Sequence, residues 1–413
     1  MANENVIPQL RFPEFSGNWK PNLLGEIAIF SKGKGISKSE IDKDGEIECI
    51  RYGELYTEYS ETISEVKSRT NVSREELVFS EANDVIIPAS GETQIDIATA
   101  SCILRDGIAL GGDLNIIKSK TNGVFLSYYL NNGKKKDIAQ LAQGISVVHL
   151  YASQLKQLKL ILPKPEEQNK IASFIAKVNN QIQLLEKEKT LLEKYKKGIS
   201  QKIFNQEIRF KDDNGNDFPD WEEKKLGSIG NTINGLTGKT KEDFGEGKPY
   251  IQYMQIFRAS KIYTNEFGFV KIDEKETQTK VKYGDVFFTT SSETPNEIGI
   301  SSVLLDEVED AYLNSFCFGF RPNSLNELVP EFAQFLFRSK NVRNEIIKLA
   351  QGSTRFNMSK VEFMKQKISL PCETEQQKIA SFLSAIDIQI DQLGNQIVRS
   401  KSFKKGLLQK MFV

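Results

Sequence analysis

An apolar seam in the middle of the chain limits the possible fold more than any other feature of the sequence. Between Glu166 and Phe204, apolar residues recur in alternating steps of four and three, interrupted at seam positions only by Lys189 and Lys196. Such spacing is typical of a long α-helix that packs along its length on another helix. At 1.5 Å per residue, this stretch of about 39 residues makes a rod of roughly 58 Å, too long for the core helix of a compact domain. The stretch is therefore predicted to be a spacer.

A second copy of this stretch lies 208 residues later, near the end of the printed sequence. Leu162-Pro163 and Glu167-Gln168 in the first copy correspond to Leu370-Pro371 and Glu375-Gln376 in the second. A fixed offset held over about 40 residues indicates an internal duplication, so the second helix is the predicted partner of the first. The predicted seam comprises Ile171, Ile175, Val178, Ile182, Leu185, Leu192 and Ile199 in the first helix, and Ile379, Leu383, Ile386, Ile390, Leu393, Ile397 and Leu407 in the second.

The duplication divides the chain into four predicted segments. These are a globular region at 1–162, a spacer helix at 163–206, a second globular region at 207–370 and a C-terminal spacer helix at 371–413. In the first globular region, short apolar runs between turn residues predict strands, the last of them at 158–162. Before that last strand, helical spacing of the apolar residues runs from 124 to 141, and Gly144 is predicted to cap that helix at its C-terminus.

Bulk composition sets only broad limits on function. The formal net charge is zero, so any DNA-binding face must be a local basic region balanced by acidic residues elsewhere. No apolar run approaches 18 residues, and the first residues lack the basic and apolar stretch of a secretory signal. The four cysteines are scattered without Cys-x-x-Cys spacing, which favours reduced thiols and a cytoplasmic protein.

Known catalytic and metal-binding patterns are absent from the sequence. His149 is the single histidine, which excludes multi-histidine metal sites, and the second copy has Asn357 at the corresponding place. The run from Gly235 to Thr240 lacks the first glycine of a phosphate-binding loop, since Ile233 stands there. The chain has no Pro-Pro pair, whereas amino-methyltransferases carry an Asn/Asp-Pro-Pro-aromatic element. We therefore predict no catalytic residue and no metal site.

Polar loops repeated in both globular regions are instead suited to recognition. Arginine pairs with guanine, asparagine and glutamine pair with adenine, glutamate accepts from cytosine, and lysine, serine and threonine reach phosphates. The predicted DNA-binding residues of the first region are Lys32, Lys34, Arg51, Tyr52, Ser90, Glu92, Thr93, Gln94 and His149. Those of the second region are Lys239, Lys241, Gln252, Tyr253, Ser291, Ser292, Glu293, Thr294, Asn296, Thr354, Arg355 and Asn357.

Two globular regions, each followed by Leu-Pro, Glu-Gln and Lys-Ile-Ala-x-Phe elements and a long seam helix, resemble the specificity subunit of type I restriction–modification systems. The resemblance covers the whole chain. It implies an α+β fold with two mixed α/β target recognition domains, separated by a pair of long antiparallel coiled-coil helices and related by a pseudo-two-fold duplication. Each domain would read one half of a bipartite, asymmetric double-stranded DNA target, and the chain itself would not be an enzyme.

The same resemblance implies partners and cofactors outside this chain. Two methyltransferase subunits and the restriction subunits would assemble on the specificity subunit and direct adenine methylation and restriction. S-adenosylmethionine would bind the methyltransferase subunits, while ATP and magnesium would be used by the restriction subunits.

Two alternatives remain open on the residues alone. The chain could be a tandem coiled-coil adaptor whose globular regions bind proteins rather than DNA, or the recognition part of an enzyme that acts on DNA by itself. Copurification with a methyltransferase would distinguish a specificity subunit from a protein-binding adaptor. An assay of the isolated chain with S-adenosylmethionine and DNA would distinguish it from an enzyme that acts by itself.

Overall fold

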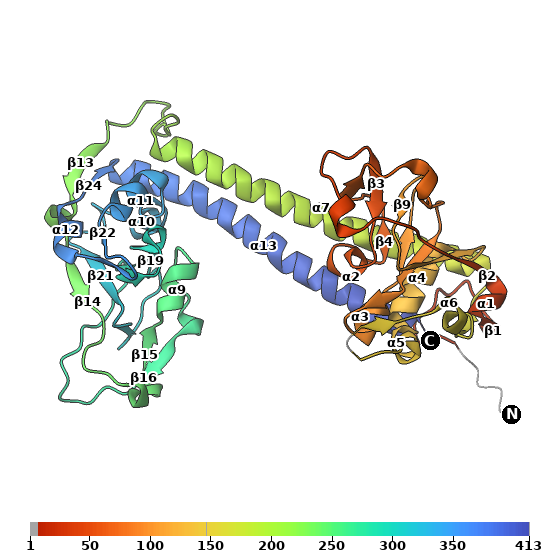
Figure 1. Ribbon diagram of the computed structural model, residues 1–413. Coiled ribbons are helices and arrows are strands. Elements are labelled where there is room, and N and C mark those ends of the chain that lie inside the picture. The colour runs from red at the N-terminus through yellow and green to blue at the C-terminus, as the bar shows by residue number, and fades with distance from the viewer. Residues whose placement is uncertain (1–6, 146, 413) are drawn as a thin grey trace. The chain divides into compact units, whose positions relative to one another are not determined.

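A computed structural model describes residues 7–145 and 147–412, which form two compact units (Figure 1). Unit 1 comprises Met1–Glu186 and Asn395–Val413, and unit 2 comprises Lys187–Gly394. Each unit therefore contains one globular head together with part of both long helices. The four predicted segment boundaries remain a prediction, because this division of the chain follows compactness rather than the ends of the helices.

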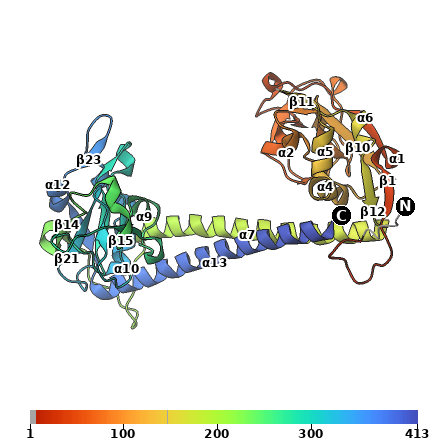
Figure 2. The same cartoon turned by 90° about the horizontal axis from the view of Figure 1, so that it is seen from below.

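The two predicted spacer stretches are long, unbroken helices. Helix α7 spans Pro165–Phe204 and helix α13 spans Glu373–Met411. Within each unit the two helices lie side by side and run in opposite directions (Figures 1 and 2). Among residues 7–145 and 147–412, no helix is both long and apolar enough to cross a membrane.

The predicted seam residues are all buried or half-buried. The two lysines at seam positions have different environments. Lys189 is half-buried, pairs with Glu193 and lies 3.9 Å from the place where a Cβ would stand on Gly394. Lys196 instead pairs with Asp387 of α13, and its ammonium lies 5.2 Å from the ring centroid of Phe335, so this lysine joins the helices to the head.

The head of unit 1 is built on a five-stranded sheet in the order β2-β10-β6-β8-β4. These strands are β2 Ala28–Lys32, β10 Leu114–Ser119, β6 Val85–Pro88, β8 Ser101–Ile103 and β4 Thr62–Ile63. Smaller sheets pair β1 Lys20–Leu23 with β12 Lys159–Leu162, β3 Ile47–Ile50 with β5 Ser68–Thr70 and β9 Ala109–Leu110, and β7 Ser90–Gly91 with β11 Val148–His149. Its helices are α1 Leu24–Ile27, α2 Glu54–Thr57, α3 Gln94–Ile97, α4 Gly123–Asn132, α5 Lys135–Leu141 and α6 Ala152–Leu155.

The head of unit 2 repeats this plan. Its main sheet has the order β14-β21-β17-β19, with β14 Gly230–Asn234, β21 Cys317–Pro322, β17 Val286–Thr289 and β19 Ser301–Val303. The smaller sheets are β13 Glu222–Lys225 with β24 Lys367–Leu370, β15 Phe244–Ile251 with β16 Gly268–Val270 and β20 Tyr312–Leu313, and β18 Ser291–Ser292 with β23 Phe356–Met358 and β22 Ala350–Gln351. Its helices are α8 Leu226–Ile229, α9 Tyr253–Arg258, α10 Pro330–Leu336, α11 Lys340–Ile347 and α12 Lys360–Lys365. The duplication in sequence is thus a duplication of topology.

One local prediction is wrong. The helical stretch predicted from 124 to 141 is two helices, α4 and α5, and α5 is capped by Ala142 in an extended conformation rather than by Gly144. Gly144 has a φ of +129°, and a Cβ there would stand 2.0 Å from the carbonyl oxygen of Val147. Glycine is required because the chain makes a tight turn back toward β11.

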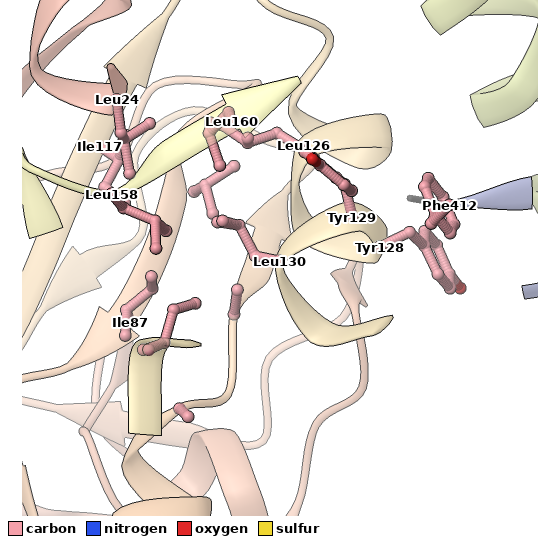
Figure 3. Packing of buried hydrophobic residues seen from close by; sticks show 14 of the residues in the cluster. Leu24, Ile87, Ile117, Leu126, Tyr128, Tyr129, Leu130, Leu158, Leu160 and Phe412 are labelled. Atoms are coloured by element: carbon pink, nitrogen blue, oxygen red, sulfur yellow. The ribbon is translucent and has the colours of Figure 1, made fainter. Parts of the chain in front are cut away.

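Both ends of each long helix are buried in a head. In unit 1 the core includes Ile171 and Ile175 near the start of α7 and Phe412 just after the end of α13. Figure 3 shows Phe412 beside the two tyrosines of α4, and its ring is stacked on Tyr129 with the centroids 5.8 Å apart. In unit 2, Phe204 at the end of α7 packs against Phe332 of α10, with the ring centroids 5.7 Å apart and the two rings tilted.

A buried glutamate near the start of each long helix holds the segment that leads into the head. The carboxylate of Glu167 accepts two hydrogen bonds of 2.8 Å from the guanidinium of Arg11 and one of 3.2 Å from the indole of Trp19. In unit 2, Glu375 accepts from Arg209 at 3.2 and 2.7 Å and from Trp221 at 3.2 Å. The two carboxylate side chains are 2% and 0% exposed, so each depends on these donors to offset its desolvation.

The next residue fixes the turn before each helix. The Gln168 amide donates to the carbonyl of Pro163 and accepts from the backbone of Asn122. Gln376 makes the equivalent bonds, donating to Pro371 and accepting from the backbone N–H of Val329. The shared Leu-Pro and Glu-Gln elements therefore attach each long helix to the helix that covers the head's main sheet.

In each unit, a lysine near the C-terminal end of a long helix also contacts the head. In unit 1, the ammonium of Lys404 lies 5.3 Å from the ring centroid of Tyr128 and 3.6 Å from the carboxylate of Glu61. The side-chain amide of Asn179 donates to the hydroxyl of Tyr128. Lys196 is the equivalent of Lys404 by the 208-residue offset, but its carboxylate partner Asp387 lies on the long helix rather than on the head.

We predict that Glu167→Ala destabilises unit 1 by about 3 kcal/mol, because the change leaves the Arg11 guanidinium and the Trp19 indole without their acceptor. The neighbouring Glu166 is exposed, so Glu166→Ala is a matched control that should have little effect. The chain has two tryptophans, one per unit, so denaturant unfolding followed by fluorescence in a Trp221→Phe background reports on unit 1. Equal denaturation midpoints for the Glu167→Ala and Glu166→Ala variants would contradict this stabilising role of Glu167.

Candidate functional site

Each head contains a cleft formed where a short helix faces the loop that follows a central strand. In unit 1, the first cleft has a volume of about 710 Å³. It is lined by Gly35, Ile36, Ser37, Lys38, Glu40, Arg51, Tyr52, Gly53, Glu54, Tyr56, Thr57, Glu92, Gly112 and Asp113. The predicted residues Arg51, Tyr52 and Glu92 thus lie on one surface, although 40 residues separate Tyr52 from Glu92 in the chain.

The second cleft, in unit 2, has a volume of about 330 Å³. It is lined by Tyr253, Met254, Phe257, Ser291, Ser292, Glu293, Glu297, Phe316 and Arg355. Five of the predicted DNA-binding residues therefore come together here, namely Tyr253, Ser291, Ser292, Glu293 and Arg355.

Hydrogen bonds and strand register show that the two clefts are equivalent. The backbone N–H of Arg51 donates to the side chain of Glu54, and that of Gln252 donates in the same way to Gln255, so α2 and α9 begin alike. Strand β11 pairs His149 with Ser90, and β23 pairs Asn357 with Ser291. His149 and Asn357 therefore occupy one structural position, as the sequence comparison predicts.

Arg51 is engaged within the first head. Its guanidinium donates two hydrogen bonds, of 3.2 and 3.1 Å, to Oε1 of the buried Glu54, which also accepts from Ser68. The arginine side chain is 26% exposed, so one edge of the guanidinium faces the cleft while the other is used to compensate a buried carboxylate.

The lysines of the basic loops differ in their availability. Lys32, Lys34 and Lys241 are exposed. Lys239 is not, because its side chain is only 7% exposed and its ammonium is paired with Glu276. The hydrogen bond from Lys239, with others from Gln278 and the backbone of Asp273, lowers the pKa of Glu276 to about 2. The pair therefore stays ionised at neutral pH, which argues against a role for Lys239 in binding phosphate.

The capping boxes of the two loops align a different lysine with Lys241. The side chain of Glu40 accepts from the backbone of Ser37, and that of Asp243 accepts from the backbone of Thr240. Ser37 and Thr240 are each followed by a lysine, so Lys38 is the structural equivalent of Lys241. Lys38 lines the first cleft and was missed because Lys32 and Lys34 stand in the more conspicuous Gly-Lys run.

Several other predicted residues serve local structure. The hydroxyl of Thr93 caps α3 by accepting from the backbone of Asp96, and the amide of Gln94 donates to the carbonyl of Ala142. The hydroxyl of Ser292 donates to Glu297 and accepts from the backbone of Thr294. The carbonyl of Asn296 accepts from Arg343. Gln252 and Thr354 are exposed beside the lining residues Tyr253 and Arg355.

A glycine turn places one exposed residue beside each strand β11 or β23. Gly352 has a φ of +132°, and a Cβ there would stand 2.2 Å from the carbonyl oxygen of Arg355, which repeats the geometry of Gly144 and Val147. Val147 and Arg355 therefore occupy equivalent positions. The shared Gln-Gly element is the turn that presents them, rather than a helix cap.

Asp113 and Phe316 complete the clefts and were not predicted from the sequence. The carbonyl oxygen of Asp113 accepts from the backbone of Ala89, and that of Phe316 accepts from the backbone of Thr290, so the two residues are equivalent. No periodicity or charge run marks either residue. The one signal available in the sequence was their position, since each lies in the short loop between β9 or β20 and the strand that follows it. In the described ranges 7–145 and 147–412, no group of three or more His, Cys, Asp and Glu residues could hold a metal ion.

Comparison with known proteins agrees with this duplicated arrangement. The family described as "Type I restriction modification DNA specificity domain" matches residues 16–194 and again 219–398. The chain belongs to this family. It is accordingly a DNA specificity subunit of a type I restriction–modification system, which is a non-catalytic role.

A curated relative matches over most of both chains. The type I restriction enzyme MjaVIII specificity subunit of Methanocaldococcus jannaschii is 25% identical over 393 residues, covering 92% of this chain and 88% of the relative.

Solved structures show the same fold. The type I restriction–modification S subunit from M. genitalium aligns with a TM-score of 0.59 and 17% identity over 99% of each chain. The HsdS subunit from Thermoanaerobacter tengcongensis aligns with a TM-score of 0.51 and 16% identity, over 95% of this chain and 96% of that one. These likenesses support the α+β fold with two related heads and two long helices.

Proposed function

We propose that each head of this specificity subunit reads one half of a bipartite DNA target through its cleft. The observation that supports this most directly is that two topologically equivalent clefts carry different side chains, with Asp113 in one where the other has Phe316. The strands beside them also differ, with His149 on β11 where β23 has Asn357. Two heads with different surfaces would read two different half-sites. The target would then be asymmetric, unlike the palindromes read by symmetric dimers.

The residues proposed to contact DNA divide into two kinds. The exposed Lys32, Lys34, Lys38 and Lys241 are suited to phosphates. Glu92, His149, Glu293, Arg355 and Asn357 are exposed in or beside the clefts and carry the donors and acceptors that distinguish base edges. Lys239 and Thr93 have structural roles and are better regarded as supports.

The length of the long helices supports a role in setting the gap between the half-sites. Helix α7 contains 40 residues, and at 1.5 Å per residue such a helix is roughly 60 Å long. At 3.4 Å per base pair this length corresponds to about 18 base pairs, which leaves room for two short half-sites and an unread gap.

Exposed aromatic side chains on the long helices support docking of two methyltransferase subunits, one on each unit. Tyr195 on α7 is 53% exposed, and Phe403 on α13 is 59% exposed. The two residues are 208 positions apart, so they occupy equivalent places in unit 2 and unit 1. Leu191 and Val398 add exposed apolar surface in the same two units. Apolar groups held in solvent at equivalent positions suit a partner that binds twice.

In the proposed complex the chain directs chemistry that its partners perform. Methyltransferase subunits would bring S-adenosylmethionine and methylate adenine in the target, and restriction subunits would use ATP and magnesium. The specificity subunit would supply only target choice and geometry.

Reconstitution tests this function. The purified chain with S-adenosylmethionine and DNA should transfer no methyl group, whereas the chain copurified with its methyltransferase should methylate adenines within one asymmetric two-part sequence. Methylome sequencing of a host that carries both subunits reads the target out directly. A continuous or palindromic motif, or transfer by the chain alone, would contradict the proposal.

Docking is tested by removing the exposed aromatic residue of one unit at a time. We predict that Tyr195→Ala or Phe403→Ala lowers the mass of the complex by one methyltransferase subunit, and that the double variant loses both. Ile29→Ala is a control, because Ile29 is 75% exposed on strand β2 of a head rather than on a long helix. Mass photometry at nanomolar concentration counts the subunits, and complexes of unchanged mass in all variants would rule out this docking surface.

A further inference from the structure

Three equivalent positions in or beside the two clefts carry side chains of different character. Where the first cleft has Asp113, the second has Phe316, and where the first has Gly53 at the start of α2, the second has Met254 at the start of α9. The third difference is the turn residue, which is Val147 in unit 1 and Arg355 in unit 2. At these three positions the first head has an acidic residue, a glycine and a valine, whereas the second head has two large apolar residues and a cation.

The apolar residues of the second cleft are held in solvent. Phe316 is 57% exposed and Met254 is 49% exposed, although both lie among polar groups such as Glu293. The guanidinium of Arg355 lies 6.0 Å from the ring centroid of Phe316, a cation–π contact that keeps the two side chains together. Among residues 7–145 and 147–412, Arg355 has no carboxylate within ion-pair distance, so its donors remain available.

The exchange of Asp113 for Phe316 also changes the serine beneath it. In unit 1, the hydroxyl of Ser90 hydrogen-bonds the Asp113 carboxylate at 3.1 Å. In unit 2, the hydroxyl of the equivalent Ser291 is buried without a hydrogen-bond partner among the described residues. Leaving a buried hydroxyl unpaired has a cost, so the aromatic ring is not explained by the internal needs of the head.

In the major groove, one base presents an apolar group. The C5-methyl of thymine is contacted by apolar side chains, whereas cytosine presents an amino donor that a carboxylate accepts, and guanine presents two acceptors that an arginine pairs with. An exposed ring and thioether beside a free guanidinium fit thymine next to guanine. The carboxylate of Asp113 at the same place in the other head fits cytosine.

We propose that Phe316, supported by Met254, is a specificity-determining residue that reads the methyl group of a thymine in the half-site of the second head. Arg355, held against the ring, pairs with a neighbouring guanine. Asp113, at the equivalent position of the first head, favours cytosine instead of thymine. This inference rests on the proposed function, because it needs each head to read one half-site.

The test replaces single thymines of the mapped target by deoxyuridine, which lacks only the methyl group. The complex of this chain with its methyltransferase is titrated at fixed salt with each synthetic duplex. One buried methyl corresponds to about a fourfold change in affinity. We expect about fourfold weaker binding for at least one thymine of one half-site, and Phe316→Ala should make the thymine and uracil duplexes bind equally there.

Two variants serve as controls. Phe269 on β16 is 48% exposed and does not line the second cleft, so Phe269→Ala should keep the fourfold ratio. Asp113→Ala should also keep it, because Asp113 belongs to the other head. If no thymine in either half-site shows a methyl effect, the inference is wrong. It is equally wrong if Phe316→Ala weakens binding but leaves the ratio of thymine-duplex to uracil-duplex affinity unchanged. That result would indicate a ring inserted between base pairs. A complex that binds no two-part target overturns the proposed function as well.

Discussion

A buried carboxylate at the start of each long helix is the interaction on which the rest of this structure depends. Glu167 and Glu375 each accept hydrogen bonds from an arginine and a tryptophan in the segment that leads into a head. Neither glutamate could be buried without its donors. A second contact supports each crossing, since Phe12 packs against Phe174 of α7 and Phe210 packs against Phe382 of α13. The pairing joins the beginning of each head to the helix that follows it, so a spacer and a recognition surface become one unit. The duplication preserved this joint with both donors intact.

Elsewhere the two copies satisfy the same need with different residues. Lys404 and Lys196 both lie over an aromatic ring of a head, but the first pairs with Glu61 on the head and the second with Asp387 on the long helix. The clefts diverge further, since a carboxylate in one is replaced by an exposed ring in the other. The framework tolerates such exchanges because the anchoring glutamates and their donors do not line the clefts. The two heads of this chain thus share their anchors and differ in their clefts.

The long helices were predictable from the sequence because a seam of period 3.5 is a property of consecutive residues. The cleft was predictable only in part. Arg51, Tyr52 and Glu92 were found through their repetition in both heads, and the structure brings them together. The burial of Lys239 could not be foreseen, because its partner Glu276 lies 37 residues away in the chain. Asp113 and Phe316 were missed because they share no residue type, and only strand register makes them equivalent. Gly144 was assigned to a helix end because a positive φ is equally typical of caps and of tight turns.

The claim that the long helices set the gap between two independent half-sites is tested by lengthening both helices together. Lys189 lies beside Gly394, so matching seven-residue insertions after Thr190 in α7 and after Gly394 in α13 extend the antiparallel pair by one heptad. Seven residues add about 10 Å, or about three base pairs. An insertion after Asn214, in an exposed turn, is the control. Methylome sequencing should show the same two half-sites separated by a gap about three base pairs longer, for the helix insertions alone. Altered half-sites with an unchanged gap would contradict the account.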